Sequence, residues 1–163
     1  MALDATAGGA NSNSYLSVAD ADSYVAERVG DTSAWDVDDA EKEKALISAT
    51  RRLDQQDFKG CKTTREQALE WPRYDVPDRS GWYYDSDAIP APIKQAAAEL
   101  ALVLIGNPEL LDDTGLEYFD AISTGDTSIT PKARQAGTLP AHVQRFLRGL
   151  TKGGAGVTRL VRG

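Results

Sequence analysis

Aromatic and basic side chains alternate in one stretch of the sequence, residues 71–84. Rings interleaved with guanidinium groups can stack the bases of single-stranded nucleic acid while the cations meet its phosphates. The same rings can instead pack an irregular segment onto a hydrophobic core, and we favour this structural interpretation for the segment as a whole. The candidate stacking residues are Trp71, Arg73, Tyr74 and Trp82.

Side chains with catalytic potential are sparse. The single histidine, His142, falls within the last predicted helix, with no partner for acid–base chemistry indicated nearby. The single cysteine, Cys61, excludes an intramolecular disulfide framework, and no spacing of His and Cys fits a zinc site. The glycines at 153–156 lack the Lys-Ser/Thr pair of a phosphate loop. We therefore expect no enzyme activity, no metal and no cofactor.

The net charge of −7 conceals a division along the chain. Residues 1–130 hold 11 basic and 25 acidic side chains, so they carry 11 − 25 = −14. Residues 131–163 hold seven basic and no acidic side chains. This asymmetry indicates a basic arm aimed at an acidic partner, either nucleic acid or an acidic protein surface. A solvated and partly disordered terminus is the open alternative.

A single helix is expected to organise the fold, over about residues 90–105. Prolines near its start are tolerated because the first N–H groups need no intrahelical partner, and Gly106, Asn107 and Pro108 end it. The run between these signals is apolar nearly all round, which is typical of a buried helix. It is too short to span a bilayer. No apolar run with a charged front opens the sequence, so we expect a protein that is used without secretion and without a membrane partner.

The remaining start and stop signals predict a mainly α fold, a single domain of about four helices around this central helix. Ser17 can cap a first helix that ends near Gly30. Asp38 begins a second helix that continues to about Gln56. Leu139 and the proline that follows it open the last helix.

Smaller elements and arms complete the prediction. A Gly-Asp pair between β-branched and aromatic residues predicts a small β-hairpin over about 118–130. A short helical turn is predicted at 67–71. The helical domain spans 15–152, preceded by a flexible N-terminal arm, 1–14, whose small polar residues bury little apolar area. A flexible basic C-terminal tail, 153–163, follows it.

Three pieces of the sequence together resemble the head-tail adaptor (head-completion, connector) proteins of tailed bacteriophages. The first piece is Asn-Ser-Tyr-Leu-Ser-Val-Ala-Asp-Ala-Asp-Ser-Tyr at 13–24. The second contains Ala-Leu-Ile-Ser-Ala-Thr-Arg-Arg-Leu-Asp at 45–54, then Gln-x-Leu-x-Trp-Pro-Arg at 67–73, followed by Ile-Pro at 89–90. The third is Ser-Thr-Gly-Asp-Thr-Ser-Ile at 123–129, followed by Leu139, Pro140 and Leu147. The order of the pieces is more specific than any one of them.

The resemblance implies a structural protein of the virion neck, assembled in the host cytoplasm. Its helical protomers form a homo-oligomeric ring, usually of twelve copies, beneath the portal protein. The ring extends the channel through which DNA passes without sequence recognition, and it receives the next neck or tail protein. Portal docking in the family includes the C-terminal segment, so the docking candidates here are Arg145, Arg148, Lys152, Val157, Arg159, Leu160, Val161 and Arg162.

Phage sequences similar to this one are also labelled as similar to DnaT, a single-stranded-DNA-binding replication protein. This label gives the alternative function. The aromatic segment and the basic tail favour it, whereas the acidic body opposes non-specific binding to phosphates. From the sequence we expect a non-enzymatic head-tail adaptor, with single-stranded-DNA binding as the alternative.

Overall fold

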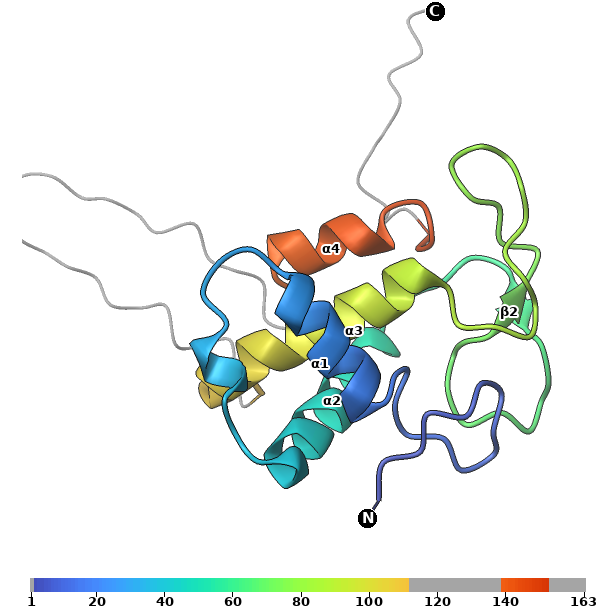
Figure 1. The fold of residues 1–163 in the computed structure, drawn as a ribbon. Coiled ribbons are helices and arrows are strands. Elements are labelled where there is room, and N and C mark those ends of the chain that lie inside the picture. Colours follow the sequence, from blue (N-terminus) through green and yellow to red (C-terminus); the bar gives the residue numbers. More distant parts are fainter. Residues whose placement is uncertain (1, 112–138, 153–163) are drawn as a thin grey trace, which may run out of the picture.

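The computed structural model describes residues 2–111 and 139–152. Within these residues the chain forms four α-helices and a small antiparallel sheet, which confirms the predicted mainly helical fold (Figure 1). The helices are α1 (Val18–Glu27), α2 (Asp39–Leu53), α3 (Ala91–Gly106) and α4 (Ala141–Leu147), with short 3-10 turns η1 (Ser33–Trp35) and η2 (Pro108–Leu111). The strands are β1 (Cys61–Lys62) and β2 (Arg73–Tyr74), in a register that places Cys61 opposite Tyr74.

Helix α3 is the centre of the fold, as predicted. It packs against α2, α4, α1 and η1, and Figure 1 shows it running between the other helices. Its buried residues cover nearly the whole circumference, which is why the sequence lacks a polar face here. Ile93 and Leu100 are among the largest fully buried side chains of the protein, and four alanines of the helix are fully buried as well. The buried residues of α3 are Ile93, Ala96, Ala97, Ala98, Glu99, Leu100, Ala101, Leu102 and Leu104.

The predicted caps begin the first two helices. The side chain of Ser17 accepts the backbone N–H of Asp20 at 3.1 Å, and the side chain of Asp38 accepts that of Glu41 at 2.8 Å. Each bond satisfies an N–H that has no intrahelical partner. Helix α1 ends at Glu27, slightly earlier than the stop signal at Gly30 indicates.

A buried carboxylate interrupts the apolar surface of α3. Glu99 is only 6% exposed, and its Oε1 atom accepts hydrogen bonds from the Tyr24 hydroxyl and from Nε of Arg28, both at 2.9 Å. The Nε2 atom of His142 lies 3.8 Å from Oε2 of Glu99. The sequence indicated no partner for His142, and the structure corrects this expectation by placing Glu99 beside it. The four side chains join α1, α3 and α4 at one polar point.

Residues 2–14 return on themselves instead of extending from the domain. The backbone N–H groups of Asn13 and Ser14 donate to the carbonyl of Asp4 at 2.9 and 3.1 Å. The carbonyl of Gly9 accepts the N–H of Ala68 at 3.0 Å, and Ser14 is fully buried. Hydrogen bonds therefore hold this segment, which we expected to be a flexible arm because its composition offers little apolar area.

Two predicted segments lie outside the described residues, and one predicted element is wrong. The hairpin predicted at 118–130 and the tail 153–163 lie outside the described residues. The short helical turn predicted at 67–71 does not form; the chain there is irregular and includes a cis peptide bond between Trp71 and Pro72. The last helix ends at Leu147, and the residues after it form a turn. Across the described part of the chain, every helix is too short or too polar to cross a membrane.

Candidate nucleic-acid interface

The predicted stacking residue Trp71 is inside the core. Its ring has no exposed surface and meets the rings of Phe58 and Tyr84 edge-on, with centroids 5.6 and 6.5 Å apart. Such edge-to-face pairs are favourable because the positive edge of one ring faces the negative face of another. Trp71 therefore closes the core beneath the irregular segment and offers no face for a base, in agreement with its structural interpretation.

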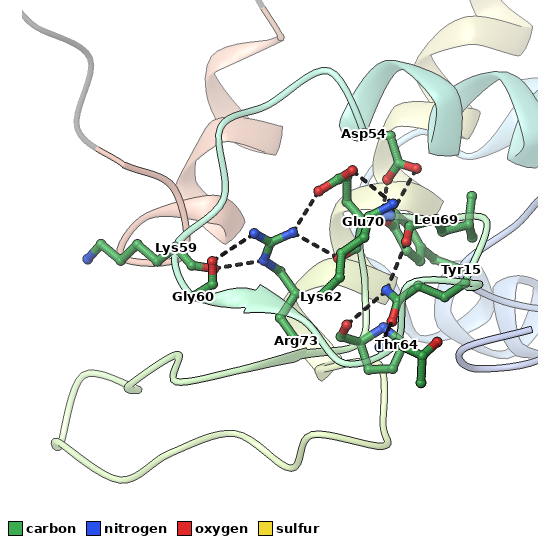
Figure 2. A network of polar contacts seen from close by, with 11 residues as sticks. Tyr15, Asp54, Lys59, Gly60, Lys62, Thr64, Leu69, Glu70 and Arg73 are labelled. Carbon is green, nitrogen blue, oxygen red and sulfur yellow. Dashed lines mark hydrogen bonds and ion pairs between the residues drawn. The ribbon is translucent and has the colours of Figure 1, made fainter.

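Arg73, a second predicted stacking residue, is also buried and fully engaged (Figure 2). Its guanidinium donates to the carbonyls of Lys59 at 2.8 Å and Gly60 at 2.9 Å. It also donates to the carbonyl of Glu70 at 3.1 Å and to the Glu70 carboxylate at 2.6 Å. With these bonds, the planar fork ties two distant loops together and has little capacity left for a phosphate.

Further polar side chains brace the same loops, as Figure 2 shows. The buried amide of Gln67 donates to the carbonyls of Leu69 at 2.9 Å and Pro72 at 3.0 Å, and its oxygen accepts the N–H of Thr64 at 3.0 Å. Asp54 accepts the hydroxyl of Tyr15 and the N–H of Glu70. Burial raises the pKa of Asp54, and burial together with that carboxyl raises the pKa of Tyr15. The motif at 67–73 is thus a scaffold that fixes the surrounding loops.

The loop that follows this scaffold, residues 75–84, presents aromatic rings to solvent. Trp82 is 77% exposed and Tyr83 is 69% exposed, while Tyr74 at the end of β2 is 43% exposed. The carboxylate of Asp78 accepts the N–H groups of Ser80 at 2.8 Å and Trp82 at 2.9 Å, which holds the loop tip in a turn. Large rings exposed on a braced loop can be covered by a partner at a small entropic cost.

A second exposed segment, which carries basic side chains, lies at the C-terminal end of α4. Arg145, Arg148 and Lys152 are exposed there. The segment is fixed by a backbone bridge between Phe58 and Thr151, and the N–H of Lys152 donates to the carbonyl of Asp57 at 2.7 Å. The structure therefore places three of the eight predicted docking residues on one exposed segment. The other five, Val157, Arg159, Leu160, Val161 and Arg162, lie outside the described residues.

Comparison with known protein families shows the family to which the chain belongs. The family model described as "Putative DnaT-like ssDNA binding protein" matches residues 1–163. The chain belongs to this family. Comparison with the curated proteins and with the solved structures gave no significant match.

From the aromatic–basic segment of this DnaT-like chain, the sequence selected two residues that are free to act and two that are not. Tyr74 and Trp82 are exposed as a stacking role requires, whereas Trp71 and Arg73 are not. Tyr83 was not among the predicted stacking residues, and only its exposure in the structure distinguishes it. Among residues 2–111 and 139–152, no three His, Cys, Asp or Glu side chains gather as a metal site would require.

Proposed function

We propose that this protein binds single-stranded DNA, with the exposed rings of the 75–84 loop stacking on bases. The exposure of Trp82 and Tyr83 is the observation that carries the proposal. Rings of this size are normally buried, and every base has a π-face on which an aromatic side chain can stack without sequence preference. The description of the family to which the chain belongs supports the same class of ligand.

The distribution of charge restricts where DNA can lie. Residues 2–111 hold 11 basic and 20 acidic side chains, so they carry 11 − 20 = −9, whereas residues 139–152 carry three bases and no acid. Phosphates are repelled by most of the surface and attracted to the end of α4. Binding is therefore local, on the face that carries both the aromatic loop and the end of α4. It needs no catalytic step, and we propose a binding role only.

Fluorescence anisotropy with a labelled oligothymidylate at physiological salt tests this proposal. Stacking is worth about 1–3 kcal/mol per base, so we expect Trp82→Ala to weaken binding by roughly tenfold or more. Val29→Ala is the matched surface control, because Val29 is 97% exposed and lies on the α1–η1 connection. Equal affinities of Trp82→Ala and wild type would refute stacking, and a wild type without affinity would refute the function.

A second candidate function is the head-tail adaptor of a phage neck, a homo-oligomeric ring between the portal protein and the next neck or tail protein. Its support is the resemblance to the adaptor family, which three pieces of the sequence carry together. One of them includes residues 67–73, whose side chains brace the loops of this fold. The acidic body also suits a DNA channel, because it would repel a passing duplex and let it slide.

Images of the purified particle, alone and mixed with portal, distinguish the two candidates. Rings seated on portal without affinity for oligothymidylate would support the adaptor in the virion. Protein bound along single strands, with no attachment to portal, would support the DNA-binding function. Replacement of Arg145 and Arg148 by Glu should weaken portal attachment if α4 carries the docking surface.

A further inference from the structure

An open groove with a volume of about 730 Å³ separates the 75–84 loop from the end of α4. Lys59, Arg79, Arg145 and Arg148 line it, and Asp78 is the only acidic residue among the described residues that line it. Four cations against one acid is an unusual balance in a chain with a net charge of −7. Figure 1 shows the loop and the end of α4 on the same side of α3.

The walls of the groove are held in place by backbone bonds. The N–H of Lys59 donates to the carbonyl of Leu150 at 2.8 Å, while the carbonyl of Lys59 accepts from Arg73. Leu147 and Leu150, each 3% exposed, anchor the end of α4 in the core. The fold itself therefore brings the four cationic residues to one groove.

Like charges that a fold holds close together repel one another, so a polyanion gains affinity from relieving the repulsion. Tyr84 and Phe146 also line the groove, which gives it apolar surfaces beside the cations. Its volume falls in the range of about 300–1,000 Å³ that is typical of sites that enclose small ligands.

We propose that this groove binds the phosphodiester backbone of single-stranded DNA, with Lys59, Arg79, Arg145 and Arg148 contacting phosphates. The inference rests on the proposed function and extends it, because it adds a backbone path to the stacking rings of Trp82 and Tyr83. Charge complementarity selects this occupant over the chain's own C-terminal residues 153–163, which carry only basic charges.

The salt dependence of oligothymidylate binding tests the groove. For single strands, the slope of log K against log salt is about −0.7 for each phosphate neutralised. The double variant Arg145→Gln/Arg148→Gln should therefore lose about 1.4 from the magnitude of the slope. The matched control is Lys44→Gln/Arg51→Gln, which removes the same charge from exposed positions on α2. Its slope should equal that of wild type.

Inorganic polyphosphate serves as a second probe, because it offers phosphates without bases. We expect wild type to bind it and the double variant to bind it at least tenfold more weakly. Equal slopes and affinities for the double variant and its control would overturn the groove, while leaving stacking at Trp82 intact. Binding of polyphosphate but not of oligothymidylate would overturn the proposed function and the DNA assignment of the groove. Loss of both ligands in wild type would overturn both proposals.

Discussion

Replacement of Arg73 separates a scaffold role from a DNA contact. The side chain of Arg73 is 8% exposed and donates to three backbone carbonyls and to the carboxylate of Glu70. Arg73→Lys keeps the charge but replaces a planar fork by a single ammonium group. Three acceptors on two loops cannot be reached from one point, so at least two carbonyls should lose their donor.

The expected cost follows from those lost bonds. A buried acceptor left without a partner costs about 1–3 kcal/mol, so two of them should give a cost of at least about 2 kcal/mol for Arg73→Lys. Arg73→Ala removes all the bonds and should cost about 3–5 kcal/mol, as breaking a buried ion pair does. The loss should not exceed this range, because Glu70 keeps a second ion pair with Lys62 at 3.2 Å.

Urea denaturation followed by circular dichroism measures these costs. Arg79→Ala, at an exposed position on the neighbouring loop, is the control and should change stability by less than about 0.5 kcal/mol. Melting temperatures should fall by about 2–4 °C for each kcal/mol in a chain of this size. Unchanged stability of Arg73→Lys, combined with a weaker affinity for single-stranded DNA, would refute the scaffold and restore Arg73 as a phosphate contact.

Three further predictions concern the core, the buried tryptophan and alkaline pH. Leu100, 1% exposed at the centre of α3, should cost about 2–5 kcal/mol when replaced by Ala, and an unchanged thermal melt would contradict its burial. Trp71→Ala should lower stability by about 3–5 kcal/mol and leave the DNA affinity of the folded protein intact; a selective tenfold loss of affinity would favour stacking instead. Burial and the bond to Glu99 raise the pKa of Tyr24 from 10.0 to about 12. Its contribution to stability is therefore present below pH 10 and lost as pH rises toward about 12, so Tyr24→Phe should flatten this part of the stability–pH curve measured by urea denaturation.

Most of the helical core could be predicted from local signals. Helix α3 is apolar nearly all round, and prolines mark its start and a glycine its end. Both its bounds and its burial therefore follow from the sequence. Ser17 caps α1 and Asp38 caps α2, because their short polar side chains reach the free N–H groups of the first turn.

The sheet and the groove could not be predicted in the same way. Strands β1 and β2 have two residues each, which is too few to show an alternating pattern. Their pairing depends on Gly60, which has a φ of 67° and where a Cβ would overlap the carbonyl of Tyr74, and on the long-range bonds of Arg73. These are tertiary contacts, so the pairing of β1 with β2 cannot be predicted from local propensity.

The sequence favoured packing for the aromatic–basic segment as a whole, but it did not separate the buried rings from the exposed ones. Trp71 and Trp82 have the same side chain, and both lie in an irregular segment with nearby arginines. The first ring lies in the segment that the long-range bonds of Gln67 and Arg73 hold against the core, whereas the second lies on the exposed loop beyond it. Lys59 could not be selected at all, because only the fold brings it to the arginines of α4.

The most direct test of the account is tryptophan fluorescence during a titration with oligothymidylate. Of the three tryptophans in the chain, Trp35 is 6% exposed and Trp71 is 0% exposed, whereas Trp82 is 77% exposed. Stacking on bases should quench the emission of wild type in a saturable manner at physiological salt, and Trp82→Phe should lose the quenching. A wild-type signal that stays constant while anisotropy shows no binding would contradict single-stranded-DNA binding on this face.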